Sequence, residues 1–497
     1  MMRLVIFHVN TMAIFSRDAQ QTRFAALGSH FYAFATIEPL KNPVLASINK
    51  RAANFLAISD QLLQSDTLLQ LLAGQSTSTH GIASVYSGHQ FGSYNPQLGD
   101  GRAVLVGEQI ARDGSIWEMQ LKGSGKTPFS RFGDGKAVLR STIREYLACE
   151  AMHALGIAST RAIALLASTT SVYRETEETA ACLLRSAPSH IRFGHFEYFF
   201  YTQQHLQLRQ LADFVIEQYF PDIAQQDASQ RYGLWFEDIV KRTAKLIAQW
   251  QSVAFCHGVL NTDNMSILGL SIDYGPYMFL DAFKPSLITN HSDHQGRYTL
   301  QQQIPIGLWN LNALAQALSP LLNREQMQQA LTLYQPTLLQ HYRALLLQKL
   351  GLEAQDNTQD DAFIGELLSL MAAQAIDYHH FFRQLSERPI TQCHKLANDW
   401  IDAPRFLQWL TRYQQRVEQQ VGGDVQRMHT MQQNNPKYVL RNYFAQQAIE
   451  TAQMGDYNYL NDLLKAVQSP FAVKEKFAHF ADLPPQSGQS IVLSCSS

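Results

Sequence analysis

Charged residues are scarce in this chain. They make up 16% of its 497 residues, against about 25% in a typical soluble protein. The formal net charge is only −2. A chain so nearly neutral has no global positive field to attract nucleic acid, so we expect no nucleic-acid partner. Binding of a charged ligand must therefore depend on a few local side chains.

Cysteines are rare, and long hydrophobic runs are missing. The five cysteines are scattered and form no C-x-x-C pair, which favours a reducing compartment over a disulfide framework or a zinc site. No run approaches the ~18 apolar residues of a membrane span, so we expect a cytoplasmic protein without membrane contact. Residues 1–16 contain an apolar patch that His8 and Asn10 interrupt. We interpret it as an irregular N-terminus and not as a signal peptide, while an organelle-targeted form stays open.

The most informative stretch covers residues 257–276, HGVLNTDNMSILGLSIDYGP. Asp263 and Asn264 lie in a polar turn, and we expect a loop, a short β-hairpin whose second strand ends at Gly275-Pro276, and a second loop. Phosphoryl-transfer enzymes of the kinase type need a carboxylate that orients or deprotonates the attacking hydroxyl, and an amide and a second carboxylate that hold divalent cations. Asp263, Asn264 and Asp273 supply that set. Plain Asx turns use the same residue types, and this stretch alone does not decide between the two.

A second set of candidates begins at residues 99–102, Gly-Asp-Gly-Arg. This turn precedes an expected hairpin with strands over residues 103–106 and 116–121, joined at Asp113-Gly114. Without Cβ atoms the backbone of Gly99 and Gly101 would approach a phosphate closely, and Arg102 would pair with it. A plain tight turn explains the same pattern.

Lys122 ends the second strand of that hairpin, and Glu145 lies on an expected helix over residues 137–155. We expect Glu145 on a different face of the helix from the apolar stripe. A strand lysine followed by a helix glutamate is the arrangement with which kinase-like folds hold nucleotide phosphates. A surface lysine and a solvated helix charge are the ordinary alternative.

Two arginines follow the next expected strands, which cover residues 160–171 and 180–184. Arg185 ends the last of these strands, and Arg192 lies in the loop after it. Together they would clamp a polyphosphate through bidentate hydrogen bonds. Ordinary charges at a protein rim would show the same pattern.

Helical patterns dominate from about residue 200, and an earlier helix-like stretch covers residues 49–72. The later expected helices cover residues 205–220, 232–255, 308–321, 324–350, 360–385, 403–420 and 438–454. Strands come first and the Asp/Asn loop falls in the helical half, which predicts an α+β fold of the bilobal protein-kinase-like type. We expect an N-terminal segment packing on the lobes (1–85), a β-rich nucleotide-binding N-lobe with one key helix (86–200), a helical C-lobe with the catalytic and metal loop (201–350) and a helical C-terminal extension (351–497).

Several long motifs together resemble the selenoprotein O family, also called the YdiU family. They are YSGHQFG, PQLGDGRA, LKGSGKTPFSRFGDGKAVLRSTIREYL, HGVLNTDNMSILGLSIDYGP and NHSDHQGRY, with a cysteine near the C-terminus. The resemblance extends from about residue 25 to the end. It implies a kinase-like fold that binds ATP in a flipped orientation and transfers AMP to hydroxyl side chains of proteins.

The resemblance also assigns roles to single residues. It implies Asp263 as the proton acceptor, Asn264 and Asp273 as ligands of Mg²⁺ or Mn²⁺, and Glu145 as the partner that positions Lys122. The implied ATP contacts are Gly99, Gly101, Arg102, Lys122, Asp134, Gly135, Arg185, Arg192 and Asp273.

Two positions depart from the family pattern. Cys495 replaces the selenocysteine of the animal members, and Thr289 stands where close bacterial relatives would carry a cysteine. A redox disulfide between these two positions is therefore not expected.

Our leading hypothesis is a metal-dependent protein adenylyltransferase that uses ATP and modifies Ser, Thr or Tyr hydroxyls of other proteins, as a monomer. A γ-phosphoryl-transferring kinase is disfavoured, because no G-x-G-x-x-G loop precedes Lys122 and no His-Arg-Asp triplet is present. An ATP-binding regulatory pseudokinase would not need the intact set of Asp263, Asn264 and Asp273.

Overall fold

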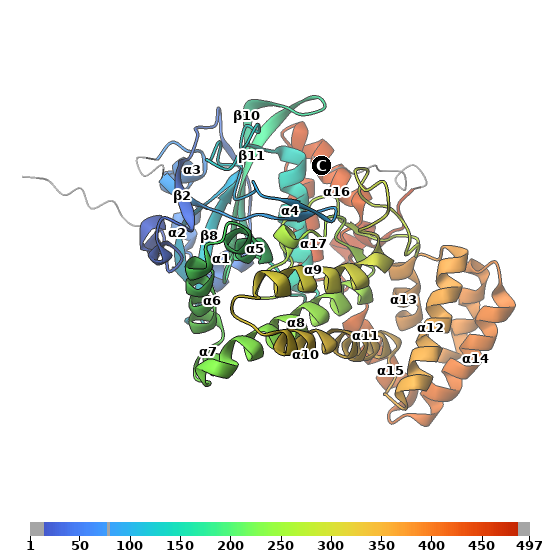
Figure 1. Ribbon diagram of the computed structural model, residues 1–497. Helices are drawn as coiled ribbons and strands as arrows, with labels where there is room; N and C mark the ends of the chain where they lie inside the picture. The colour runs from blue at the N-terminus through green and yellow to red at the C-terminus, as the bar shows by residue number, and fades with distance from the viewer. Residues whose placement is uncertain (1–13, 77–79, 486–497) are drawn as a thin grey trace, which may run out of the picture.

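The computed structural model describes residues 14–76 and 80–485 (Figure 1). Most of the segment weighed above as a signal peptide, and also Cys495, lie outside these described residues. The frame of the molecule is one nine-stranded sheet with helices packed around it. The mixed α and β composition expected from the sequence is therefore confirmed. No helix within the described ranges is long and apolar enough to cross a membrane.

The sheet is antiparallel throughout and draws strands from well-separated parts of the chain. Its order is β2 (Tyr32–Thr36), β4 (His80–Ser84), β7 (Ala103–Ile110), β8 (Ile116–Lys122), β11 (Glu177–Ala187), β10 (Arg161–Tyr173) and β3 (Val44–Ile48), with β1 (Arg17–Asp18) on β7 and β9 (Ala137–Val138) on β11. Residues 1–85 thus supply strands to the same sheet as residues 103–187. The expected turn joins β7 to β8, and Gly114 adopts a positive φ of 83° there.

The helix-like stretch over residues 49–72 is three short helices, which corrects the sequence-based expectation. They are α1 (Lys50–Phe55), α2 (Asp60–Leu63) and α3 (Asp66–Leu72). Asn49, Ser59 and Ser65 each accept a hydrogen bond from a backbone N–H of the following helix. Three such N-caps start three helices, because a capping side chain satisfies the first backbone donors only from a non-helical residue.

Helix α4 (Leu139–Ala154) packs against β10 and β11 and also against α16 (Asn442–Gln453) and α17 (Asn458–Val467). Residues 142–152 are all buried as a result. Glu145 is only 2% exposed, so the alternative of a solvated helix charge is excluded. The C-terminal helices cover the side of α4 that the sheet leaves open.

The helical half begins with α5 (Phe193–Tyr201), α6 (His205–Tyr219), α7 (Pro221–Ala224) and α8 (Ala228–Ser252). After the loops of residues 257–302 it continues with α9 (Gln303–Ala317), α10 (Arg324–Thr332) and α11 (Tyr334–Leu350). The single helix expected over residues 324–350 is therefore two. Pro336 lies in the first turn of α11, where a missing backbone N–H is tolerated, whereas it would break an interior hydrogen bond of one long helix.

The next four helices form a unit with its own apolar core, seen on the right of Figure 1. They are α12 (Asn357–Gln374), α13 (Tyr378–Glu387), α14 (Ala403–Gln419) and α15 (Gly423–Asn434). The helix expected over residues 360–385 is interrupted at Ala375, which has a left-handed φ of 52°. Asp377 then caps α13 by accepting from the His380 N–H at 2.8 Å. Beyond this C-terminal bundle the chain returns through α16 and α17 to α4.

Candidate active site

A cleft of about 630 Å³ lies where the sheet, α4 and the loop of residues 257–276 meet. Every site residue expected from the sequence lines it. These residues are Gly99, Gly101, Arg102, Lys122, Asp134, Gly135, Glu145, Arg185, Arg192, Asp263, Asn264 and Asp273. The fold thus brings together segments separated by more than a hundred residues of sequence.

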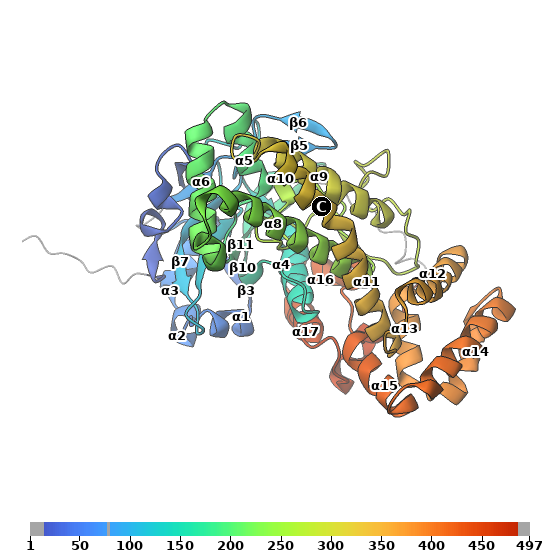
Figure 2. The same cartoon turned by 60° about the horizontal axis from the view of Figure 1, so that its bottom comes forward.

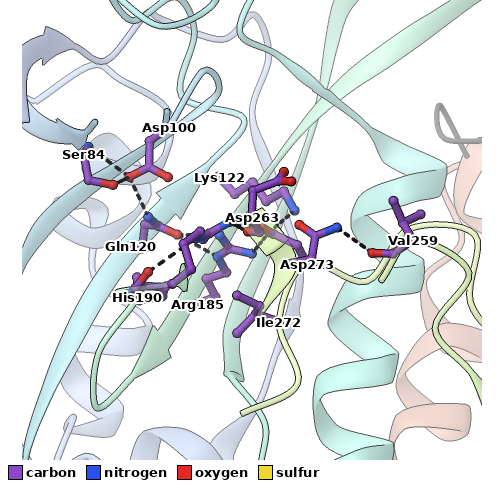
Figure 3. Close-up of polar contacts among 12 residues, drawn as sticks. Ser84, Asp100, Gln120, Lys122, Arg185, His190, Val259, Asp263, Ile272 and Asp273 are labelled. Atoms are coloured by element: carbon purple, nitrogen blue, oxygen red, sulfur yellow. Dashed lines mark hydrogen bonds and ion pairs between the residues drawn. The ribbon is translucent and has the colours of Figure 1, made fainter. Parts of the chain in front are cut away.

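Asp273 is the centre of a cluster of charges (Figure 3). Its Oδ1 accepts from Lys122 Nζ at 3.0 Å and from Arg185 Nη1 at 2.6 Å, and its Oδ2 accepts from Arg192 Nη1 at 2.5 Å. Burial opposes ionisation of Asp273, but the charges of Lys122, Arg185 and Arg192 outweigh it and hold its pKa well below the usual range. Asp273 is therefore ionised at neutral pH.

Glu145 shares two of these cations. Its Oε2 accepts from Lys122 Nζ at 2.6 Å, and its Oε1 accepts from Arg185 Nη1 at 2.5 Å. Burial would raise its pKa, yet the neighbouring positive charges of Lys122 and Arg185 lower it. Three cations, counting Arg192, face two carboxylates, so the cluster carries one positive charge in excess. A buried excess charge beside a cleft attracts an anionic ligand.

Asp263 lies in a single 3₁₀ turn (Thr262–Asn264), and its backbone carbonyl accepts from Arg192 of the cluster at 3.1 Å. Its Oδ2 accepts from Gln90 Nε2 at 3.0 Å, whereas its Oδ1 is buried and has no hydrogen-bond partner among the residues that the structure describes. Burial raises the pKa of Asp263 to about 7. A cleft carboxylate with a raised pKa and one uncommitted oxygen is suited to accept a proton.

Asn264 and Asp273 present the oxygen ligands that a hard divalent cation prefers. The Asn264 Nδ2 donates to the Val259 carbonyl at 2.9 Å, which leaves its amide oxygen as an acceptor. Within the described ranges no group of three or more His, Cys, Asp or Glu residues could hold a metal ion. A cation here would therefore have two protein ligands and take the rest from phosphate and water, which is the usual mode of Mg²⁺.

The short β-hairpin expected between Asp263 and Pro276 does not form, which corrects the sequence-based expectation. Strands β12 (Phe255–Cys256) and β13 (Met278–Phe279) pair outside this stretch, and inside it only single bridges occur, from Ser266 to Arg192 and from Ser271 to Ser159. The two halves of this loop therefore pair with other segments of the chain and not with each other. Asp273 then follows in the left-handed region with a φ of 54°, which Asp tolerates better than most residues.

The glycines of the cleft permit a close approach between two loops. Gly99 has a φ of 102°, and a Cβ there would lie 2.6 Å from a Phe129 ring atom. Gly135 has a φ of 70°, and a Cβ there would lie 2.0 Å from the Gly125 carbonyl oxygen. A side chain at either position would push the loops apart, so the sequence requires glycine there. Gly101 is similarly close to Phe129, with a Cβ distance of 2.9 Å to its carbonyl oxygen.

The remaining two candidates differ in their partners. Asp134 is bound by Arg174, with both guanidinium contacts at 2.9 Å, and its pKa is lowered because these bonds and the charge of Arg174 outweigh its partial burial. Arg102 is exposed on the cleft and forms no ion pair with any described residue. Arg102 is therefore available to an anion, whereas Asp134 is held in place.

Three residues that hold the site were not identified from the sequence. Gln120 Oε1 accepts from Arg185 Nε at 2.8 Å and from Nη2 at 2.6 Å, and it lies directly across from Arg185 on the neighbouring strand. Gln120 could have been identified from its spacing, because a residue two positions before Lys122 on the same strand points to the same face of the sheet. Tyr86 packs its ring 4.8 Å from the Arg192 guanidinium, and Arg174 lies in a turn that had no assigned role.

Thr289 is buried beside Cys256, with 3.4 Å between its Oγ1 and the Cys256 Sγ. Burial raises the pKa of the Cys256 thiol to about 12, so this sulfur stays protonated and unreactive at neutral pH. Four cysteines, Cys149, Cys182, Cys256 and Cys393, are free thiols and buried.

Comparison with known proteins shows the family of this chain. Residues 15–468 match the family model described as protein adenylyltransferase SelO. The protein nucleotidyltransferase YdiU of Pseudomonas aeruginosa (strain LESB58) is 47% identical over 479 residues, which cover 96% of this chain and 98% of that protein. The protein nucleotidyltransferase YdiU of Vibrio cholerae serotype O1 is 46% identical over 494 residues, covering 98% of this chain and 100% of that protein. This chain therefore belongs to the SelO family of protein adenylyltransferases.

Proposed function

We propose that this chain transfers AMP from ATP to Ser, Thr or Tyr hydroxyls of other proteins and releases pyrophosphate. The observation that carries the proposal is the meeting of Asp263 with the Asp273-centred charge cluster in one cleft of a SelO family member. A proton acceptor and an anion site in one cavity are what transfer between a hydroxyl and a phosphate requires.

Asp263 is the proton acceptor in this proposal. The Asp263 carboxylate orients the acceptor hydroxyl and takes its proton as the hydroxyl oxygen attacks the α-phosphorus in line with the departing pyrophosphate. The new bond joins that oxygen to the α-phosphorus, and the bond to the β-phosphate oxygen breaks. Rate enhancement comes mainly from positioning and from fixed charges.

The excess positive charge supports a flipped ATP, with the β- and γ-phosphates deep among the cations. Pyrophosphate leaves with a high negative charge, and Lys122, Arg185 and Arg192 are already arranged around a carboxylate. We assign ATP contacts to them and to Arg102, Asp134, Gly99, Gly101, Gly135 and Asp273, with Glu145 positioning Lys122. Arg185→Ala and Arg192→Ala variants that kept full AMP transfer would contradict this arrangement.

Asn264 and Asp273 would hold Mg²⁺ or Mn²⁺. The amide orientation of Asn264 and the ionised carboxylate of Asp273 fit such a cation. When bound, the cation would neutralise phosphate charge. Removal of divalent cations with a chelator is then expected to abolish transfer, and transfer unaffected by the chelator would exclude this role.

A bilobal kinase-like arrangement is part of the same proposal. Residues 86–200 would form the nucleotide lobe, with residues 1–85 completing its sheet, and residues 201–350 the helical lobe, with residues 351–497 as an extension. The cleft between a β-rich and a helical part supports it. Four buried free thiols support a cytoplasmic location, and near-neutral net charge supports the absence of a nucleic-acid partner. We also propose a monomer.

A paired label-transfer assay tests the function. The purified chain and a cell extract are incubated with Mg²⁺ and with ATP labelled at either the α- or the γ-phosphate, and an Asp273→Ala variant is the control. Label that enters protein only from the α-position supports AMP transfer. Label only from the γ-position would make the chain a kinase, and no label from either would favour an ATP-binding regulatory protein.

A further inference from the structure

A separate small hairpin packs against the turn of Asn261 to Asn264, which contains Asp263 and is named the catalytic turn. Its strands are β5 (Gly88–Gln90) and β6 (Ser93–Asn95), which pair only with each other and lie beside α5 (Figure 2). The hairpin contains most of the YSGHQFG motif, for which neither the charge cluster nor the glycine loops gives a reason. It is separated from Asp263 by 173 residues at Gln90, so its contacts are products of the tertiary fold.

The backbone of the hairpin contacts the catalytic turn residue by residue. The His89 N–H donates to Thr262 Oγ1 at 2.7 Å, and the Phe91 N–H donates to Asn261 Oδ1 at 3.4 Å. Gly88 packs against Asp263 itself, because a Cβ on Gly88 would lie 3.0 Å from the Asp263 Cβ. Three successive residues of the turn are thus each held by one residue of the hairpin.

The hairpin is itself held by contacts with α5 and with Tyr298. The His89 Nδ1 lies 2.7 Å from the buried Glu197 carboxylate on α5, and the Ser87 N–H donates to the Gly194 carbonyl at 3.1 Å. Phe91 N–H also donates to the Tyr298 hydroxyl at 2.8 Å, which ties the hairpin to the NHSDHQGRY motif. A rigid backing of this kind allows one side chain to set the position of another within a fraction of an ångström.

Gln90 makes the decisive contact. Its Nε2 donates to Asp263 Oδ2 at 3.0 Å, and within residues 14–76 and 80–485 this is the only side-chain hydrogen bond to that carboxylate. The carboxylate torsion of an aspartate is soft and roughly two-fold, so it needs a partner to stay in one orientation. Arg192, which donates to the Asp263 backbone carbonyl at 3.1 Å, is a competing partner for a freed carboxylate.

We propose that Gln90 is a positioning residue of the transfer reaction, which holds the Asp263 carboxylate in the one orientation from which it accepts the proton of the acceptor hydroxyl. The proposal rests on the proposed function, and it adds a residue and a motif to it. Gln90 lines the cleft, but its side chain is committed to Asp263, and the proposal gives it no contact with ATP. Its loss should therefore lower the turnover number and leave the affinity for ATP unchanged.

A matched pair of substitutions tests this. Gln90→Met removes the donor and nearly preserves the side-chain length, whereas Gln97→Met makes the same change at an exposed residue of the same segment that does not line the cleft. We expect Gln90→Met to lower kcat about ten- to a hundredfold, as for loss of a hydrogen bond to a charged group. The KM for ATP, the Kd for ATP and the thermal midpoint should stay at wild-type values, and Gln97→Met should match wild type throughout.

Gln90→Asn sharpens the test, because it keeps an amide that is one methylene too short to reach. It should lose kcat as Gln90→Met does, whereas recovery would show that the hairpin adapts and would overturn a fixed geometry. Wild-type turnover in Gln90→Met would overturn the proposal, and so would a loss of rate that merely follows weaker ATP binding or a lower thermal midpoint.

Crystal structures of wild type and Gln90→Met give a readout independent of activity. We expect one orientation of the Asp263 carboxylate in wild type and a rotated or split carboxylate in the variant. An unchanged carboxylate in the variant would overturn the positioning role. If the wild-type chain transferred no AMP at all, the proposed function would fail, and the crystal structures would still decide whether Gln90 orients Asp263.

Discussion

Two lysines are buried in the described part of this protein, Lys122 in the cleft and Lys349 at the end of α11, where it packs against the C-terminal bundle. Lys122 is 8% exposed and pairs with two carboxylates, Glu145 and Asp273. Lys349 is 3% exposed, and its Nζ lies 5.0 Å and 5.5 Å from the ring centroids of Phe382 and Tyr378. Among the described residues, its Nζ donates one hydrogen bond, to the Asn434 carbonyl at 3.4 Å.

The two environments compensate the cost of burying an ammonium group in opposite ways. A buried charge is stable only if it is paired or if it is lost. At Lys122 the carboxylates provide the counter-charge, so a cation is kept ready beside a cavity. At Lys349 no carboxylate of a described residue forms an ion pair, and burial lowers its pKa from 10.5 to about 7. A buried lysine that is paired with carboxylates next to a cleft therefore indicates a ligand site. A buried lysine without a counter-charge, whose pKa is lowered, indicates a side chain that only fills the core.

The largest effect is expected for Asp273→Asn, which tests the charge cluster in the cleft. The change keeps shape and the left-handed backbone but removes the charge that three cations share. We expect AMP transfer to fall at least about a thousandfold, because metal binding and electrostatic positioning are lost together. The thermal midpoint should also fall, since three buried cations then face only Glu145.

Transfer of α-phosphate label and thermal unfolding are the measurements for Asp273→Asn. Binding of ATP in the absence of divalent cations should persist, because the freed cations still attract phosphate. A variant within tenfold of wild-type transfer would show that Asp273 is not the centre of the reaction site.

The second test exchanges each lysine for methionine. Lys122→Met should lower kcat/KM about a hundredfold with little loss of stability, because Arg185 still pairs with Glu145 and Asp273. Lys349→Met should leave transfer unchanged and raise the thermal midpoint, because it removes a buried amine without a counter-charge. Impaired transfer in Lys349→Met would mean that the bundle influences the cleft, and the contrast between the two lysines would be lost.

Much of the cleft was predictable because its chemistry is carried by residue types at recognisable positions. Asp263, Asn264 and Asp273 are the residue types that phosphoryl transfer uses, and the strand lysine Lys122 precedes the helix glutamate Glu145 as in kinase-like folds. The sequence also indicated the hairpin that places Lys122, since Asp113-Gly114 separates two apolar runs.

What the sequence did not reveal depends on contacts between distant segments. Arg144 on α4 bonds Asn442 on α16, 298 residues away, and such contacts explain why α4 is buried on all sides. A single-sequence pattern reports the faces of one helix and not what will cover them. The same holds for Gln90, whose partner Asp263 is chosen by the fold, and for Lys349, which resembles any other helix lysine until α13 and α15 enclose it.

The pH dependence of stability gives the third test. Above pH 10.5 Lys349 is neutral in both states and its contribution to stability is fully present. As the pH falls from 10.5 to about 7, the unfolded chain binds a proton that the folded chain does not, so stability is lost. The shift corresponds to a few kcal/mol, on the order of 1.4 per pKa unit.

Thermal midpoints of wild type and Lys349→Met at about pH 7 and about pH 9.5 measure this effect. We expect the advantage of the variant to be larger at the lower pH and to shrink as the pH rises. An advantage that does not change with pH would mean that Lys349 keeps its charge in the folded bundle, and that the aromatic rings alone stabilise the cation.

The smallest expected effect concerns Arg102, which is neither a buried cation paired with carboxylates nor a buried cation without a counter-charge. It lines the cleft but is exposed, and no described carboxylate pairs with it, so water stabilises its charge in the absence of ligand. Arg102→Ala should raise the KM for ATP about tenfold and leave kcat and the thermal midpoint unchanged, because an exposed charge adds to phosphate binding but not to the fold. The effect should weaken at high salt, since exposed charges are screened while the buried cluster is not.

Steady-state kinetics of wild type and Arg102→Ala at low and high ionic strength measure this effect. A loss of kcat, or a salt-independent loss of affinity, would place Arg102 with the buried cations that hold Asp273.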